Sequence, residues 1–191
     1  FLLGNIAWSD TDHARARRTI SGERGAQESW EQVRTKLGVQ VARLLQAGDT
    51  ADCRVAIFPL APVSSCVALG YLLTNRPRTR LFQYHRDAQG WRWHSDSPGA
   101  DHVSVAGLPR SPITKKGDVA ICFGISASIT EHQIRELKRR FLGRITVTVP
   151  NPSTSWLRHE RQLLDLASIS RDTFERCARL FPRAEGWHLF C

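Results

Sequence analysis

The stretch 55–93 constrains the fold of this chain more than any other segment. The apolar run Val55–Phe58 ends in a Pro-Leu-Ala-Pro turn and passes directly into a helix-periodic stretch, 62–75. A second strand-like run, 79–84, follows. A strand, a helix and a strand in this order predict a right-handed parallel crossover. Because open α/β sheets bind ligands outside the carboxyl ends of their strands, the residues after each strand are the first candidates for a site.

A second crossover is predicted in the C-terminal half. Val119–Phe123 is apolar throughout, as a strand covered on both faces must be. Thr130 and Gln133 have the spacing of a capping box that opens a helix, which we expect to end at Gly143. The β-branched run Ile145–Val149 predicts the next strand. The other expected elements are strands at 1–8, 54–58, 102–105 and 187–190, a return strand beginning at 91–93, helices at 27–47, 155–167 and 171–180, the last capped by Ser170, and an Arg-rich connection at 9–25.

These signals together predict an α/β fold with Rossmann-like βαβ units, a mainly parallel sheet and flanking helices. No stretch approaches 18 consecutive apolar residues and no signal-peptide pattern opens the chain, so we expect no membrane association and a cytoplasmic location. The five cysteines form no Cys-x-x-Cys pair, which favours a reducing compartment without disulfides or a zinc site. The chain has no methionine, even at its first position, and we expect it to be a fragment of a longer protein.

The chain is strongly basic. It has 27 Lys and Arg residues against 18 Asp and Glu residues, a net charge of +9. Arginine greatly outnumbers lysine, and its planar fork suits phosphate recognition better than a lysine point charge does. A GC-rich genome, which favours arginine codons, explains the same bias. A chain with this charge attracts polyanions, whatever its fold.

Three loops follow predicted strand ends and enter predicted helices, at 59–65, 124–130 and 150–155. The second and third are rich in serine and threonine. Helix N-termini hold phosphates readily, because they offer free backbone N–H groups and the positive end of the helix dipole. Serine and threonine are also ordinary helix caps, so one such loop alone is ambiguous. Three loops at one edge of a sheet favour a binding site.

Aromatic residues lie close to these loops in the sequence. Tyr84 and Trp91 are near Arg86, and Trp156 follows the third loop. Nucleic-acid bases stack on aromatic faces and guanidinium planes, at roughly 1–3 kcal/mol per base. We expect Trp93 to belong to the core, whereas Trp156 either stacks on a base or packs inside the protein. The pattern therefore adds a base-binding element to the predicted phosphate loops.

The sequence gives little support to a catalytic site. The loop containing Ser126 and Ser128 approaches the Gly-x-Ser-x-Gly nucleophile elbow but lacks its last glycine, and no acid-then-histidine pair follows at a convincing strand end. There is no Walker lysine, no paired-histidine zinc helix and no His-Asn-His nuclease pattern with metal-binding cysteines. We therefore expect no enzyme activity, no cofactor and no metal site in this chain.

The Tyr-His-Arg-Asp stretch 84–87 and the Gly-Trp-Arg-Trp stretch 90–93, placed after the first crossover, resemble the first half of a SAVED domain. This domain is the CARF-related sensor of bacterial CBASS antiphage effectors. In that family the second CARF-like half begins with a short apolar strand, which Trp187–Phe190 resembles. The resemblance implies one SAVED-like sensor domain over 1–191, with a second half that starts near 187 and is incomplete.

The resemblance also implies a function. Such a sensor binds a cyclic di- or trinucleotide, here with a dinucleotide favoured, self-associates on binding, and activates a linked effector such as an HNH nuclease or a protease. Because the sequence has no helix with a heptad seam or a spare apolar face, we expect a mainly monomeric chain without ligand. Two alternatives stay open: a hydrolase or ring nuclease that cleaves such a ligand with Ser126 or Ser128, and a basic nucleic-acid-binding module. The expected ligand-binding residues are Pro59, Leu60, Ala61, Pro62, Ser64, Tyr84, Arg86, Trp91, Ser126, Ser128, Thr130, Ser153, Thr154 and Trp156.

Overall fold

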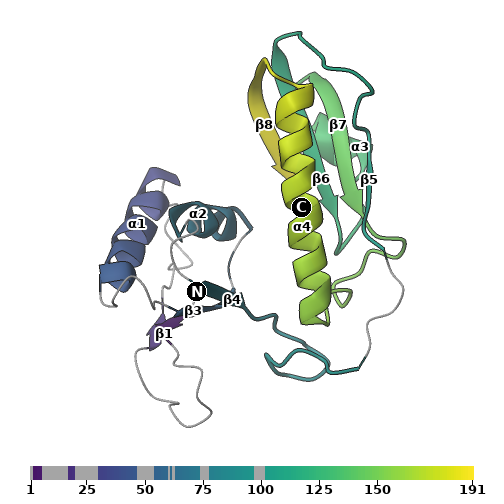
Figure 1. Cartoon of the computed structure of the whole chain (residues 1–191). Coiled ribbons are helices and arrows are strands. Elements are labelled where there is room, and N and C mark those ends of the chain that lie inside the picture. The colour runs from purple at the N-terminus through teal and green to yellow at the C-terminus, as the bar shows by residue number, and fades with distance from the viewer. Residues whose placement is uncertain are drawn as a thin grey trace. The chain divides into compact units, whose positions relative to one another are not determined.

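The computed structural model divides into two compact units, Phe1–Arg92 and Trp93–Cys191 (Figure 1). It describes residues 2–5, 17–19, 30–46, 54–59, 61, 63–73, 78–96 and 102–191. Within these residues, none of the helices has both the length and the apolar composition needed to cross a bilayer.

The first unit contains a four-stranded sheet of order β2-β1-β3-β4. Strand β3 is parallel to β4 and antiparallel to β1, and β1 is antiparallel to β2. Helix α2 joins β3 to β4, so the predicted first crossover is confirmed. The elements are β1 (Leu2–Asn5), β2 (Arg17–Thr19), α1 (Trp30–Gln46), β3 (Arg54–Phe58), α2 (Val63–Leu73) and β4 (Arg78–Leu81).

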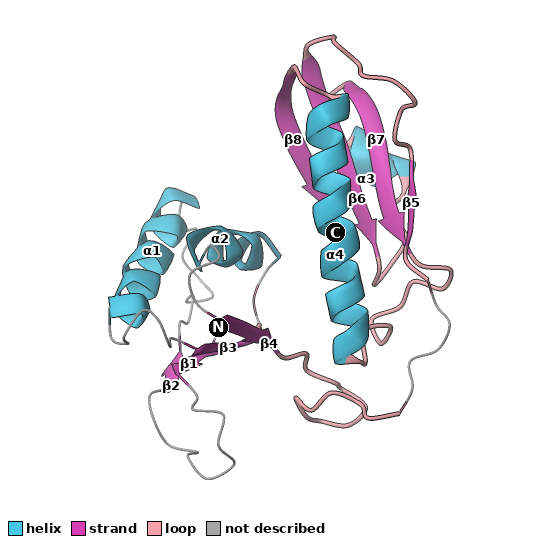
Figure 2. Ribbon diagram, viewed as in Figure 1, coloured by secondary structure: helices cyan, strands magenta, loops and turns pink. Residues whose placement is uncertain are grey.

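Both helices of this unit lie on the same side of the sheet (Figure 2). Leu37, Val41 and Leu44 recur at three- and four-residue steps along α1 and form one buried stripe. That stripe packs with Val55 and Ile57 of β3 and with α2. Full burial of each such side chain stabilises the fold by about 1.5–3 kcal/mol.

Helix α2 also exposes apolar side chains. Val63 and Val67 are each 51% exposed and Tyr71 is 80% exposed. Their spacing of four residues puts them on one face of the helix. The expectation that no helix has a spare apolar face is therefore wrong for α2, whose buried side is supplied by Leu69 and Leu73 with the partly buried Ala68 and Leu72.

The second unit contains a four-stranded sheet of order β5-β7-β6-β8. Strand β6 is parallel to both β7 and β8, and β5 is antiparallel to β7. Helix α4 lies along one face of this sheet and α3 lies on the other (Figure 2). The elements are β5 (Ser104–Ala106), β6 (Gly117–Gly124), α3 (Glu131–Arg135), β7 (Phe141–Thr148), α4 (Glu160–Leu180) and β8 (Ala184–Phe190). The α/β class with βαβ units is confirmed.

The core of the second unit lies between the sheet and α4. Val119, Ile121 and Ile145 pack against Cys177 of α4 and against Phe181, the residue that follows this helix. The run Val119–Cys122 of β6 is buried, as predicted for a strand covered on both faces, and Phe123 is half-buried.

Gly143 does not end a helix, as we expected, but lies inside β7. A Cβ atom at this position would lie 2.5 Å from the Phe181 ring, so glycine lets the ring sit directly on the strand. The preceding helix α3 ends already at Arg135. Lys138 has a φ of 51°, a left-handed conformation that cannot continue an α-helix.

One further element differs from expectation. The segment 160–180 is a single helix, not two helices separated before 171. Ser170 does not cap a second helix: its hydroxyl donates to the Leu166 carbonyl at 2.6 Å, the back-bonding typical of a serine inside a helix.

Candidate functional site

Strands β3 and β4 bring the first candidate residues to one edge of their sheet. The two strands are parallel, with Ile57 opposite Leu81, so their carboxyl ends meet. The Phe82 N–H still donates to the Ile57 carbonyl at 2.9 Å. Phe58 and Phe82 therefore lie side by side where the paired strands end.

Four aromatic residues pack together at this edge, and we call Phe58, Phe82, Tyr84 and Trp91 the aromatic cluster. The rings of Phe58 and Phe82 are stacked, with centroids 4.6 Å apart. Trp91 meets Phe58 edge-on at 5.1 Å and Tyr84 at 5.2 Å. All four residues are only half-buried, so the cluster keeps accessible aromatic surface. It lies where α/β sheets bind their ligands.

Sequence reasoning named Tyr84 and Trp91 but missed Phe58 and Phe82. An apolar aromatic residue at the end of an apolar run looks like core. The signal that could have identified them is their place in the sheet, because both phenylalanines lie at the carboxyl ends of neighbouring parallel strands. The cluster also has a cation nearby: the Arg80 guanidinium carbon lies 5.4 Å from the centroid of the Phe82 ring.

A tight turn brings the last two rings of the cluster together. The His85 N–H donates to the Gly90 carbonyl at 2.8 Å, and the Gly90 N–H donates back to the His85 carbonyl at 3.2 Å. This pairing sets Tyr84 beside Trp91, the residues that flank it. The return strand expected at 91–93 is wrong, because the pairing is limited to this one bridge.

The turn exposes Arg86, while its neighbour His85 is only 5% exposed. The Arg86 side chain is thus accessible two residues after Tyr84, beside the aromatic cluster. The Asp87 carboxylate accepts the Ala88 N–H at 3.0 Å, so it stabilises the turn.

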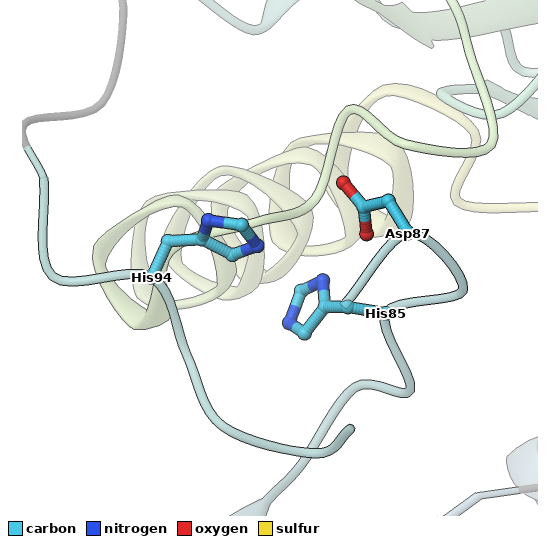
Figure 3. Close-up of side chains that lie close together, drawn as sticks. All are labelled: His85, Asp87 and His94. Carbon is cyan, nitrogen blue, oxygen red and sulfur yellow. The ribbon is translucent and has the colours of Figure 1, made fainter. Parts of the chain in front are cut away.

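Figure 3 shows the side chains of His85 and Asp87, which come from this turn, together with that of His94. Because His94 belongs to the second unit and the other two residues to the first, we assign these three side chains no joint metal site.

The start of α2 lies at the same edge as the aromatic cluster, since this helix follows β3 directly. Ser64 is exposed in its first turn. Ala61 precedes the helix, and its carbonyl accepts a weak hydrogen bond from the Cys66 thiol at 3.8 Å. Burial raises the pKa of the Cys66 thiol. Of the remaining candidates, Pro59 is half-buried, and Leu60 and Pro62 lie outside the described residues.

In the second unit, the loops 124–130 and 150–155 leave β6 and β7 at a shared edge. Gly124 lies opposite Thr148, whose hydroxyl donates to the Gly124 carbonyl at 2.9 Å. The Ser153 N–H donates to the Ile125 carbonyl at 3.0 Å and ties the two loops together. The structure therefore brings these two predicted loops side by side. The expectation that all three loops share one edge of a sheet is wrong, because the loop 59–65 follows β3 of the other sheet.

The hydroxyl groups of these loops have different roles. Thr130 caps α3: its hydroxyl accepts the Gln133 N–H at 3.3 Å, and its own N–H donates to the Gln133 side chain at 2.8 Å, so the predicted capping box is confirmed. Ser153 contacts Ser155 at 3.3 Å. Three hydroxyls are exposed and make no hydrogen bond within the described part of the chain: those of Ser126, Ser128 and Thr154.

The helix-dipole argument for phosphate binding weakens at both loops. Helix α4 begins at Glu160 with His159 at its N-cap, so the loop 150–155 does not enter it directly. Helix α3 spans only five residues, too short for a substantial dipole. Any anion held by these loops is bound by the hydroxyls and local backbone N–H groups.

Trp156 lies inside the second unit. It is 6% exposed, and its backbone N–H donates to the Ser153 carbonyl at 3.0 Å. Its indole Nε1 is buried without a hydrogen-bond partner among the described residues. The sequence left open whether Trp156 stacks on a base or packs inside the protein. Its burial favours packing.

One histidine–aspartate pair of the second unit lies at the start of β6, far from the candidate nucleophiles. His188 Nε2 is 3.0 Å from Asp118 Oδ2, which also accepts a hydrogen bond from Arg139 at 2.7 Å. That hydrogen bond is the main reason why the pKa of Asp118 lies below its usual value. Asp118 lies near the start of β6 and Ser126 follows its end, a separation of about 20 Å along an extended strand. These groups cannot form a serine triad.

Residues 34–191 match the model of a family described as SAVED, "SMODS-associated and fused to various effectors sensor domain". The matched segment includes most of α1 and every described element from β3 to β8. No curated protein matches the chain.

Proposed function

This chain belongs to the SAVED family of sensor domains, and we propose that it senses a cyclic oligonucleotide, binding it at the aromatic cluster of the first unit. The family resemblance stated from the residues is confirmed by the match over 34–191. We favour a cyclic dinucleotide over a trinucleotide as the ligand.

The aromatic cluster is the observation that carries this proposal. Its four rings are half-buried and meet at the carboxyl ends of two parallel strands. A purely structural aromatic core would be fully covered, as Val55 and Ala56 of the adjacent strand are. Each base that stacks on such a surface gains roughly 1–3 kcal/mol. Two bases stacked on neighbouring rings would together contribute to the binding free energy.

Arg86 supplies the complementary charge. It is exposed on the turn that joins Tyr84 to Trp91, close to the proposed stacking surface. The phosphates of a cyclic nucleotide are fully ionised at neutral pH, and arginine binds them in a bidentate way. The exposed Ser64 at the start of α2 offers a hydroxyl and nearby free N–H groups at the same edge.

The second unit, taken by itself, has its own candidates for ligand contacts: Ser126, Ser128 and Thr154. All three are exposed and have unused hydroxyl groups within the described part of the chain. They can donate to phosphate oxygens or accept from base amino groups. The same hydroxyls do not support the hydrolase alternative, because neither Ser126 nor Ser128 forms a hydrogen bond with a histidine within the described part of the chain.

We further propose that ligand binding drives self-association and so activates a linked effector, such as an HNH nuclease or a protease, in antiphage defence. The family description as a sensor fused to various effectors supports this proposal. The cysteines of the described residues, Cys66, Cys122, Cys177 and Cys191, are all free, as in a reducing cytoplasm. Light scattering with and without ligand tests the assembly step.

Calorimetric titration of the chain with cyclic di- and trinucleotides tests the binding proposal. We expect binding of at least one cyclic dinucleotide, with the ligand recovered intact by chromatography afterwards. Replacing Trp91 with alanine should weaken binding by about 5- to 150-fold, the equivalent of roughly 1–3 kcal/mol for one stacked base. Trp187, which is 46% exposed on β8, provides a matched control, and its alanine variant should bind normally. Equal losses in both variants, or no binding of any cyclic nucleotide, would refute the proposal.

A further inference from the structure

The two edges of the second sheet differ in charge. At the carboxyl edge, the loops 124–130 and 150–155 contain no charged residue. At the opposite edge, the connections 107–116, 136–140 and 181–183 lead into β6, β7 and β8. We call the six basic residues at the ends of these connections the basic edge. They are Lys115, Lys116, Lys138, Arg139, Arg140 and Arg183.

The sheet topology places these residues side by side. Strand β6 is flanked by β7 and β8, and all three run in the same direction. Their first residues pair across the sheet, Gly117 with Ala184 and Asp118 with Phe141. Adjacent strands are about 4.8 Å apart, so the three connections span roughly 10 Å. They lie at the upper end of the second unit in Figure 1.

Only part of this positive charge is neutralised. Arg139 pairs with Asp118 at 2.7 Å. Lys116 lies 3.8 Å from Glu185. The other four members are exposed and form no ion pair within the described part of the chain: Lys115, Lys138, Arg140 and Arg183.

Two other negative groups near the basic edge do not cancel these four charges. Glu136, at the start of the middle connection, lies 3.4 Å from His132 Nε2. The C-terminus of α4, which ends at Leu180, contributes the equivalent of only about half a negative charge. A clear positive excess therefore remains at this edge.

The surrounding side chains limit the kind of polyanion that fits. Phe181 is buried and Phe141 is half-buried, so no fully exposed aromatic ring in these connections is available for stacking on a single-stranded base. Leu137 is the one large apolar side chain there that is exposed among the described residues, at 46%, which is too little for insertion into a membrane surface. The basic edge is thus suited to phosphates alone.

We propose that the basic edge binds the phosphate backbone of double-stranded DNA without reading its sequence. The major groove of B-form DNA is about 12 Å wide, so an edge of roughly 10 Å can face both of its backbones. The major groove of an RNA duplex is narrow and deep and does not offer this fit. The surface lies at the opposite end of the strands from the hydroxyl-bearing loops, so this proposal does not rest on the proposed sensor function.

Salt dependence gives the expected signature. Each phosphate contact contributes about −0.9 to the slope of log affinity against log salt concentration. If the four unpaired basic residues all contact phosphates, the slope should be about −3.6. Removing two of them should make it shallower by about 1.8.

The test is fluorescence anisotropy of the chain with a labelled 20-base-pair DNA duplex of arbitrary sequence, between 50 and 200 mM salt. The variant Lys138→Glu/Arg140→Glu should weaken binding at least tenfold at the lowest salt and show the shallower slope. The control Arg34→Glu/Arg171→Glu changes the net charge equally at exposed positions outside the three connections that form the basic edge, and should weaken binding less than threefold. Circular dichroism checks folding, and Lys138→Gln/Arg140→Gln replaces the first variant if that variant unfolds.

Three results would overturn the proposal. Equal weakening in the edge and control variants would mean that net charge alone attracts DNA. Tighter binding to single-stranded DNA, duplex RNA or anionic lipid vesicles through the same two residues would assign the surface to another partner. Failure of the unmodified chain to bind duplex DNA at 50 mM salt would remove the function altogether.

Discussion

Replacing Trp156 with alanine tests whether this ring belongs to the core or to a ligand site. The residue is 6% exposed, so its removal opens a large buried cavity and should cost about 3–5 kcal/mol of unfolding free energy. The indole Nε1 has no hydrogen-bond partner among the described residues, so no hydrogen bond is lost. Trp156→Phe should cost far less, because phenylalanine keeps most of the buried ring volume and opens a smaller cavity.

Urea denaturation followed by circular dichroism measures both variants, and calorimetry measures ligand affinity of the folded protein. Trp187→Ala is the matched control, and because that ring is 46% exposed it should lose about half as much stability. The reasoning is refuted if Trp156→Ala costs no more than the control. It is also refuted if Trp156→Ala folds normally and loses ligand binding, since the ring would then contact the ligand.

Three further predictions follow from individual contacts. Gly143→Ala should lower the unfolding free energy by about 1–3 kcal/mol, because its Cβ would lie 2.5 Å from the Phe181 ring. Gly70→Ala, which has no atom within 4 Å of the added Cβ, should raise it by about 0.5–1 kcal/mol. Urea denaturation measures both. The pKa of the Asp118 carboxyl lies below its ordinary value of 3.8. The ionised carboxylate therefore stabilises the folded protein above pH 3.8, and this stabilisation is lost as the pH falls further. Asp118→Asn should be less stable than the parent at pH 7, and the difference in unfolding free energy should shrink at pH 3. Thr154→Glu should leave the melting temperature unchanged, because α4 starts at Glu160, but should weaken cyclic nucleotide binding if this loop contacts phosphate.

The sequence predicted the elements whose signals are continuous and local. The apolar run Val55–Phe58 is β3 almost residue for residue, and the alternation of strand and helix correctly gave the α/β class. Helix ends were less predictable, because they depend on tertiary packing. Gly143 looked like a helix stop, but its real role is to accommodate the ring of Phe181, which lies far away in the chain. No local pattern carries that information.

The candidate site was predicted in part. Tyr84 and Trp91 lie together as expected, but Phe58 and Phe82 were not named as site residues, because an apolar ring at a strand end has no distinguishing local signal. Trp156 was left open, since a tryptophan after a loop can turn either way until its neighbours are known. Exposure on α2 was missed for a similar reason: its sequence is apolar on every side, so only the packing distinguishes Leu69 from Tyr71.

Photo-crosslinking tests directly whether a cyclic nucleotide stacks on the aromatic cluster. The probe is an azidoadenine analogue of a cyclic dinucleotide that binds in the calorimetric titration. Trypsin cleaves after Arg80, Arg86 and Arg92, so the turn and its flanking rings fall in two peptides, 81–86 and 87–92. If the ligand stacks on this cluster, we expect crosslinks in these two peptides that disappear with excess unmodified ligand. Phe58, the fourth ring of the cluster, lies in the peptide 55–78. Competable crosslinks that fall neither in 55–78 nor in 81–92 would contradict the proposal.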